Sequence, residues 1–464
     1  MNRRAFLSVA AGGVLAKGAT PGKVIIAGAG MAGLSCAWEL RKRGYDVVVL
    51  EGQGRPGGRV ETLREGLAPG LTAETGATRI PDIHEFTIAY VKEFGLALEP
   101  FKPGPALADV FHLGGQNYVP HAGKEPDWRL NLRPEERRLG LAGLAEQYLL
   151  APLQQAKGSE ARPEVPEAIQ AVDRFTLREY LSRQGLSADA VQLLTLGVDD
   201  TISAGLVLLV EFNHASAHEV FHIRGGNDQL PNAIAAGLSG SIRYGCRVVG
   251  IGQDDHSAWV VIESADGRET LRGDYAVSAL PFSVARSLFR EARLSSAKQR
   301  VIQQQKYFPV DKVFLQMRRN FWAKKGLSGF ANTDLLSERF WALGGKSRED
   351  RALLLSYVIG AKAAKLDQMS LNDRCVATLA DAERVFPGAR KHFEAFRGKS
   401  WSEDPWQQGG LARFDPGELN FIGVSARKEG RIHFAGEHTS RWNGWIQGAI
   451  ESGQRVAKEI SGSV

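Results

Sequence analysis

Cysteine is scarce in this chain of 464 residues, which contains only Cys36, Cys246 and Cys375. The three residues lie far apart in the sequence and their number is odd. Neither a zinc-binding spacing nor a framework of disulfide bonds is therefore indicated. We expect all three to be small residues of the hydrophobic core.

Long apolar runs and clusters of one charge are also missing. The longest apolar run in the body of the chain, Ile202 to Val210, is too short to cross a bilayer, so no membrane span is expected. The formal net charge is +6, but lysine and arginine are dispersed, and no basic tract is interleaved with aromatic residues. Nucleic acid is therefore not an expected partner. The length and the balanced composition indicate a globular enzyme of two or three domains.

The amino terminus differs from the rest of the chain. Residues 2–7, Asn-Arg-Arg-Ala-Phe-Leu, precede a mildly apolar segment and resemble a twin-arginine export signal. We therefore assign residues 1–20 to a signal and expect a periplasmic or secreted protein. Because no A-x-A cleavage pattern follows, an unstructured basic tail on a cytoplasmic protein remains the alternative.

The clearest motif lies between Lys23 and Val60. A short apolar run, Val24 to Ile26, predicts a buried parallel strand, and Gly28, Gly30 and Gly33 follow with the G-x-G-x-x-G spacing. These glycines permit a tight turn, close approach of a pyrophosphate and close packing of the next helix. A second strand ends at Glu51, where a carboxylate can hold a ribose hydroxyl pair. The unit predicts dinucleotide binding, and leaves NAD and FAD to be separated.

The continuation Arg55-Pro-Gly57-Gly58-Arg59 adds backbone N–H groups and a fixed positive charge beside the same diphosphate. With this continuation the sequence resembles the FAD-dependent amine oxidase family, and the branch of L-amino-acid oxidases is nearest. The resemblance implies FAD as the cofactor. It also implies an α/β and α+β fold, with a discontinuous Rossmann-type FAD-binding domain, a mixed-sheet substrate domain and a helical insertion.

The resemblance, together with changes in texture along the chain, predicts the domain boundaries. The FAD-binding domain is expected at residues 21–80, 220–285 and 425–464. The substrate domain is expected at 81–124 and 286–424, and the helical domain at 125–219. A homodimer is one assembly that the resemblance leaves open.

A glycine turn, residues 74–81, leads to Arg79 before an Ile-Pro pair. In the L-amino-acid oxidase branch, an arginine in this segment clamps the substrate carboxylate, and Arg79 matches it. A guanidinium can hold a carboxylate through two parallel bonds. The alternative is that Arg79 bonds the flavin or a neighbouring acid. The resemblance also implies cofactor contacts for Gly76, Ala77 and Thr78.

Lys312 interrupts the apolar strand that starts at Val310. The family uses a lysine in this segment to hold a water against the flavin, whereas a lysine reaching the surface is the alternative. Farther on, Trp406 falls where venom-type oxidases place a tyrosine that contacts the substrate carboxylate, and its indole N–H could substitute. Leu411 stands where monoamine oxidases carry a flavin-bonding cysteine, so non-covalent FAD is expected.

The last block, residues 431–453, resembles the family's second cofactor-binding segment. It implies contacts with the flavin from Gly436, Glu437 and Ile446, at the amino end of a terminal helix whose dipole favours the anion formed on reduction. Trp445 matches an aromatic wall of the substrate pocket, the alternative being a core tryptophan. Val248 matches a residue whose backbone meets the adenine side.

One motif points elsewhere. His218-Glu219-Val-Phe-His222 satisfies H-E-x-x-H, with His214 one turn earlier, but it runs into a strand-like segment and a glycine turn. We therefore predict no metal site, and expect structural or substrate-funnel histidines.

Three functions are compatible with these features of the sequence. The first is an L-amino-acid oxidase that takes a hydride from the amine-bearing carbon and yields imine or keto acid, ammonia and hydrogen peroxide. The second is an oxidase or dehydrogenase of other amines, such as a monoamine, polyamine or alkaloid. The third is a flavin-binding protein without turnover. Arg79 favours the first, with oxygen or another electron acceptor as the second substrate.

Overall fold

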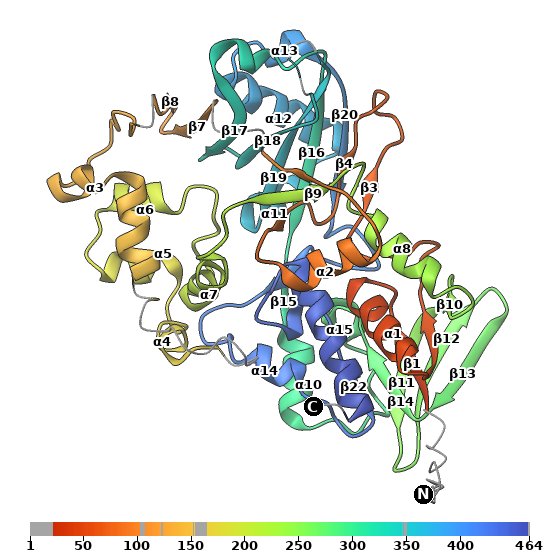
Figure 1. The fold of residues 1–464 in the computed structure, drawn as a ribbon. Coiled ribbons are helices and arrows are strands. Elements are labelled where there is room, and N and C mark those ends of the chain that lie inside the picture. Colours follow the sequence, from red (N-terminus) through yellow and green to blue (C-terminus); the bar gives the residue numbers. More distant parts are fainter. Residues whose placement is uncertain are drawn as a thin grey trace, which may run out of the picture.

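The computed structural model describes residues 22–102, 107–121, 124–151, 153, 165–345, 347 and 350–462, and Figure 1 shows their arrangement. The predicted signal at residues 1–20 lies outside the described residues. Two large sheets dominate the fold, and a group of helices lies to one side of them.

The first large sheet is parallel and has the strand order β10-β2-β1-β14-β22. Its strands are short and mostly apolar because both faces of the sheet are covered, one by helices and the other by a small antiparallel sheet. They come from three separate stretches of the chain: β1 (Lys23–Ala27), β2 (Asp46–Leu50), β10 (Ile242–Arg243), β14 (Tyr275–Ser278) and β22 (Ile432–Phe434).

Two helices pack together on this sheet, α1 (Met31–Lys42) and the carboxyl-terminal α15 (Ile446–Ser461). They approach closely at Gly453, where a Cβ atom would lie 2.4 Å from the carbonyl oxygen of Ala32. The last segment of the chain is therefore locked against the first βαβ unit. An antiparallel sheet of β11 (Arg247–Gln253), β12 (Ala258–Ser264) and β13 (Gly267–Gly273) packs on the other face of the parallel sheet, against β1 and β14.

The second large sheet is mixed, with the order β20-β16-β19-β18-β17-β7-β8. Strand β16 (Val310–Met317), second from one edge, is buried at every residue, and β19 (Ala352–Ile359) and β20 (Phe393–Ser400) pair with it antiparallel. The remaining strands are β7 (Ala108–Leu113), β8 (Gln116–Tyr118), β17 (Leu327–Thr333) and β18 (Arg339–Leu343).

The helical group lies on one side of the molecule (Figure 1). It contains α3 (Pro134–Ala145), a π-helical turn at Glu146–Leu150, α4 (Glu167–Gln170), α5 (Leu177–Arg183), α6 (Ala188–Leu194) and α7 (Ala204–His214). Between α5 and α6, Gly185 adopts a φ of +90°, so the chain turns there instead of continuing as one helix.

Shorter elements connect these parts. The strands are β3 (Thr62–Leu63), β4 (Ala73–Glu74), β5 (Ile80–Pro81), β6 (Leu98–Pro100), β9 (Val220–Ile223), β15 (Lys306–Phe308) and β21 (Leu411–Arg413). The helices are α2 (Glu85–Glu93), α8 (Gln229–Gly237), α9 (Phe282–Ala285), α10 (Ser296–Gln304), α11 (Ala361–Leu366), α12 (Leu371–Val385), α13 (Ala389–His392) and α14 (Phe421–Ala426). The 3₁₀ turns are Phe321–Lys325 and Glu437–Thr439.

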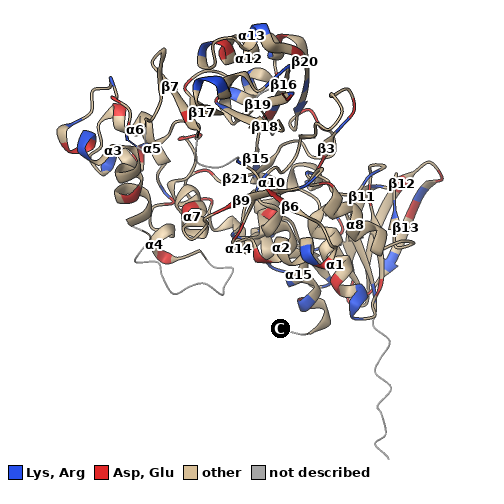
Figure 2. Ribbon diagram, turned by 45° about the horizontal axis from the view of Figure 1, so that its top comes forward, with Lys and Arg blue, Asp and Glu red and all other residues tan. Residues whose placement is uncertain are grey.

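The predicted fold class is confirmed: a Rossmann-type parallel unit built from separated segments accompanies a mixed sheet and a helical insertion. The exact division into domains stays a prediction. Lys, Arg, Asp and Glu are interspersed over the described parts (Figure 2). In the described ranges, no helix has both the length and the apolar character needed to cross a membrane.

Candidate active site

A cavity of about 970 Å³ runs through the junction of the two sheets and the helical group. At one end it is bounded by the glycine turn after β1 and by β11 and β12. At the other it reaches β18, β19 and α7. A cavity of this shape can take a long ligand and a second, smaller one end to end.

The glycine turn has the shape that a diphosphate requires. Gly28 adopts a φ of +101°, and a Cβ atom at Gly33 would lie 2.0 Å from the Gly28 carbonyl oxygen, so both positions demand glycine. A Cβ at Gly30 would meet no atom within 4 Å, and this residue faces the cavity at the amino end of α1. The open space, the free helix N–H groups and the helix dipole favour an anion there.

Glu51 lies at the end of β2, and its carboxylate accepts hydrogen bonds from the N–H groups of Ala29 at 2.8 Å and Gln53 at 2.9 Å. Burial raises the pKa of this carboxyl. The two bonds fix the carboxylate beside the glycine turn, with lone pairs left for ribose hydroxyl donors. Val248 lines the same end of the cavity from β11.

Arg59 and Glu437, both predicted to contact the cofactor, are bound to each other. The Arg59 guanidinium donates to the Glu437 carboxylate at 2.8 Å, and Asn443 and the N–H of Gly444 donate to the same carboxylate. Arg59 also donates to the Gly410 carbonyl oxygen. This network ties together three loops that line the cavity, including the one that contains Gly436.

The amino end of α15 faces the cavity. Trp445 is its N-cap residue, and Trp445, Ile446 and Ala449 line the wall. Trp445 is half-buried, and its ring stands beside the Arg79 guanidinium, so it is not a core tryptophan. No side chain caps the first N–H groups of this helix, which leaves them for a ligand.

Lys312 is buried in β16, with 3% of its surface exposed, and therefore does not reach the surface. Its ammonium donates to the carbonyl oxygens of Glu74 at 2.9 Å and Gly76 at 2.6 Å, and to the Thr78 hydroxyl at 2.7 Å. Burial is the main reason why the pKa of Lys312 falls to about 7, and burial raises the pKa of Glu74 to about 7. Lys312 thus fixes the 74–78 segment and lines the cavity.

Arg79 follows this segment directly and points into the cavity between two indole rings. Its guanidinium carbon lies 4.9 Å from the centre of the Trp341 ring and 5.2 Å from that of Trp445. Burial, and secondarily the nearby Arg339, lower its pKa to about 10. No described residue supplies it with a carboxylate or another hydrogen-bond acceptor. The alternative of a neighbouring acid as its partner is therefore not supported.

The sequence did not predict the wall of the cavity that β18 and β19 form. Tyr357 of β19 lies between Lys312 and Arg339, whose charged ends are 5.0 Å and 4.6 Å from the centre of its ring. Its hydroxyl makes no hydrogen bond within the described part of the chain. Tyr357, Arg339 and Trp341 stand on adjacent strands, and no motif distinguished them from other residues of an apolar sheet.

The structure corrects the expectation for Trp406. Its ring packs against Gly52, the neighbour of Glu51, so that a Cβ at Gly52 would lie 2.2 Å from the indole. A turn in which Asp404 accepts the N–H of Trp406 carries the side chain toward the nucleotide end of the cavity. The rings beside Arg79 are instead those of Trp341 and Trp445.

The H-E-x-x-H histidines are not on a helix, because His222 lies in β9. His214, in the last turn of α7, instead meets His84 with 3.1 Å between their Nε2 atoms. Burial lowers the pKa of both, that of His84 to about 3. Within the described ranges no group of three or more His, Cys, Asp or Glu side chains is placed to hold a metal ion.

Comparison with known proteins agrees with this geometry. A family model described as flavin containing amine oxidoreductase matches residues 31–461, nearly the whole chain. The chain belongs to this family. Members carry a flavin, and the residues present fit one: the open face of Gly30, the fixed Glu51 carboxylate and the uncapped end of α15 form a continuous cradle along the cavity.

Among individual relatives, the L-amino acid oxidase Bs29 of Bothriechis schlegelii is 27% identical, over 98% of this chain and 93% of its own. The L-amino-acid oxidase of Daboia russelii is 28% identical, over 98% and 92%. Two similar solved structures show the same fold. A putrescine oxidase variant has a TM-score of 0.82, at 22% identity over 95% of this chain and 99% of its own. Cyclohexylamine oxidase from Brevibacterium oxydans has a TM-score of 0.81, at 24% identity over 96% and 99%.

Proposed function

We propose that this amine oxidoreductase is an L-amino-acid oxidase that holds FAD without a covalent bond. The observation that carries the proposal is Arg79, a cavity-facing guanidinium without a partner among the described residues, caged by Trp341 and Trp445. Leaving such a charge unpaired is costly, and a substrate carboxylate would supply the missing partner. The relatives named as L-amino-acid oxidases, which match over almost the whole chain, support the same class.

Each group of residues has a role in this proposal. Arg79 would bind the carboxylate with two parallel bonds, and the free Tyr357 hydroxyl is available as a further donor. The indoles of Trp341 and Trp445 would orient the substrate and exclude water. The positive groups in the pocket would also favour the neutral form of the reacting amine, which is the form that can lose a hydride.

When bound, FAD would accept that hydride and pass the electrons to oxygen or another acceptor. Lys312, whose pKa is about 7, can hold or release a proton beside the 74–78 segment near neutral pH. Leu411 packs against Gly444, where a Cβ atom would lie 2.6 Å from its side chain, and offers no thiol for a thioether. The twin-arginine signal at residues 1–20, with export to the periplasm, belongs to the same proposal.

The principal alternative is an oxidase of amines without a carboxylate, and Arg79 separates the two. In an amino-acid oxidase, Arg79→Met leaves the carboxylate desolvated and unpaired, which costs about 2–5 kcal/mol in transition-state binding, or roughly 30-fold to several thousand-fold in kcat/KM. Arg79→Lys should recover only part of this, because an ammonium lacks the planar fork. In an amine oxidase, removing the charge should leave turnover unchanged or improve it.

The test measures kcat/KM of the wild type and each variant on the best amino acid and on its decarboxylated amine. Arg384→Met, at a 62% exposed arginine of α12, controls for loss of a positive charge. If the wild type prefers the amine and Arg79→Met is no worse on either compound, the amino-acid assignment is wrong.

A further inference from the structure

A second charge faces the cavity without a partner. Glu211 lies in α7, in the helical group, and lines the cavity. No described residue donates a hydrogen bond to its carboxylate or lies near enough to form an ion pair, and the pKa of this carboxyl is raised by burial alone. It lies seven residues after the N-terminal residue of α7, so it is not a cap of the helix.

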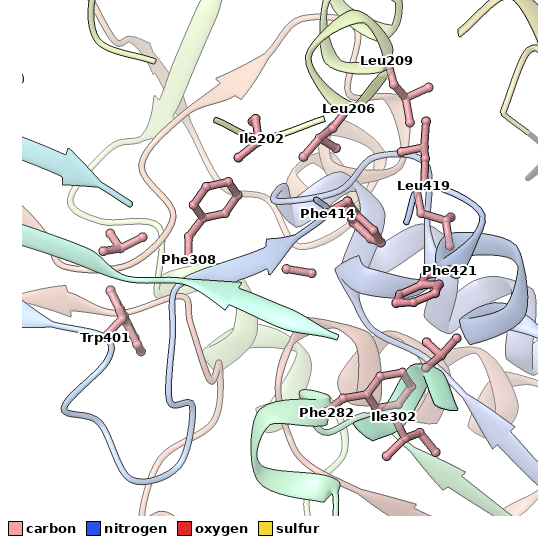
Figure 3. Packing of buried hydrophobic residues seen from close by; sticks show 14 of the residues in the cluster. Ile202, Leu206, Leu209, Phe282, Ile302, Phe308, Trp401, Phe414, Leu419 and Phe421 are labelled. Carbon is pink, nitrogen blue, oxygen red and sulfur yellow. The ribbon is translucent and has the colours of Figure 1, made fainter. Parts of the chain in front are cut away.

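The surroundings of Glu211 are apolar. Val207, Val210 and Glu211 recur at helical spacing on one face of α7, and that face turns to the cavity together with Leu206. In Figure 3 the ring of Phe308 points toward Ile202 and Leu206, which continue the same wall. One carboxylate at the end of an apolar wall is a costly feature unless something cationic binds there.

Glu211 and Arg79 have opposite charges and face one cavity, yet neither affects the pKa of the other. The other acid of this wall, Asp199, is already paired, because its carboxylate accepts from Arg413 at 3.0 Å. At the end of the cavity next to α7, Arg79 therefore offers a positive group and Glu211 a negative group that no described residue pairs, with apolar surface on the wall beside Glu211. A ligand that satisfies both has a carboxylate, an aliphatic stem and a distal cation.

We infer that the preferred substrate is an L-amino acid with a long cationic side chain, of the lysine or arginine class. This inference rests on the proposed function. Arg79 binds the α-carboxylate, the side-chain methylenes lie along Val207 and Val210, and Glu211 binds the distal cation.

Glu211 is not suited to hold the reacting α-amine. A carboxylate in contact with that amine would stabilise its ammonium form, and the ammonium has no lone pair to assist departure of the hydride. A distal ammonium or guanidinium carries no such penalty, because it keeps its charge throughout the reaction. The geometry thus assigns Glu211 to selection of the side chain.

The test compares L-lysine and L-arginine with L-norleucine, a neutral amino acid of similar length, in the wild-type holoenzyme and in Glu211→Gln. The wild type should prefer the cationic substrates. Glu211→Gln should lower kcat/KM on them by roughly 10- to 100-fold, mainly through KM, and change that on L-norleucine by less than about threefold. Glu135→Gln, at an exposed position of α3, controls for the loss of one negative charge. It should leave kcat/KM unchanged on both the cationic substrates and L-norleucine.

Equal losses on L-lysine and L-norleucine, or no loss on either, would overturn the assignment of Glu211 while leaving the amino-acid oxidase in place. Failure of the proposed function has a different signature, which is oxidation of cadaverine, the decarboxylated lysine, without oxidation of any amino acid. In that case kcat/KM is compared on cadaverine and on pentylamine, which lacks the distal amine. A loss of kcat/KM in Glu211→Gln on cadaverine alone supports the role of Glu211 in binding the distal cation, and any other pattern overturns this role.

Discussion

Replacing Lys312 by methionine tests whether this side chain acts in the chemistry or only in the architecture. Its ammonium bonds the Glu74 and Gly76 carbonyl oxygens and the Thr78 hydroxyl, and it lines the cavity that fits the flavin. If it serves reoxidation of the flavin by oxygen, Lys312→Met should slow that half-reaction at least tenfold, or about 1.4 kcal/mol of barrier. Reduction of the flavin by substrate should be affected less.

The expected effect on stability is small because two large contributions oppose each other. Each buried acceptor left unpaired costs about 1–3 kcal/mol, although Gly76 keeps its bond from the Thr78 hydroxyl. In return, methionine avoids the cost of burying an amine whose pKa falls from 10.5 to about 7. At pH 8 that cost is about 3 kcal/mol. The free energy of unfolding should therefore change by no more than about 2 kcal/mol.

The lowered pKa of Lys312 also determines how the stability of the wild type changes with pH. Between pH 7 and 10.5 the unfolded chain keeps a proton on Lys312 that the folded chain has lost, so wild-type stability rises with pH in this range. From pH 8 to 10, the free energy of unfolding of the wild type should therefore increase relative to that of Lys312→Met by up to about 1.4 kcal/mol per pH unit. This window lies above the pKa of Glu74, which burial raises to about 7 and which both proteins share.

Stopped-flow mixing of the reduced enzyme with oxygen measures the rate, and urea unfolding at pH 8 and 10 measures the stability. Lys365→Met, at an exposed lysine of α11, is the matched control. An unchanged rate of reoxidation in a folded Lys312→Met protein would refute the role in oxygen chemistry. It would leave Lys312 as a support of the 74–78 segment.

Two further outcomes follow from Leu411 and from the two arginines near the amino terminus. Acid or heat denaturation should release the flavin into solution, because Leu411 offers no thiol for a thioether; flavin retained on the precipitated chain contradicts this. Replacing Arg3 and Arg4 by lysine should keep the enzyme in the cytoplasm, and periplasmic yields equal to those of the wild type in cell fractionation would rule out the twin-arginine signal.

The parts of the site that could be predicted are those carried by local sequence. The unit from β1 to β2 is contiguous in the sequence. Its glycines are required by the local backbone, as the positive φ of Gly28 shows. Lys312 was also recognisable, because a charged residue in an otherwise apolar strand is a local anomaly. Features of the site that are formed by residues close together in the chain can therefore be predicted from the sequence.

The other wall of the pocket depends on long-range contacts and left no such mark. Arg339 and Tyr357 are direct partners in the register of β18 and β19, and only this pairing stacks the guanidinium on the phenol ring. Glu211 gave no signal because a glutamate in a helix is ordinary unless the face it occupies is known. The prediction for Trp406 fails because the direction of its side chain depends on the turn at Asp404 and on packing against Gly52, which is distant in the sequence.

The segment from Glu74 to Arg79 connects the two halves of the site. Lys312 holds its first part through three bonds, and the side-chain amide of Asn227 donates to the same stretch, bonding the Ala77 carbonyl oxygen at 2.9 Å. Arg79 follows immediately and has no partner of its own among the described residues. Its position is therefore set by the backbone behind it and by the two indoles beside it. A loosened 74–78 segment would displace the carboxylate-binding group along with the cofactor contacts, so Lys312→Met should raise the KM for an amino acid more than that for its decarboxylated amine.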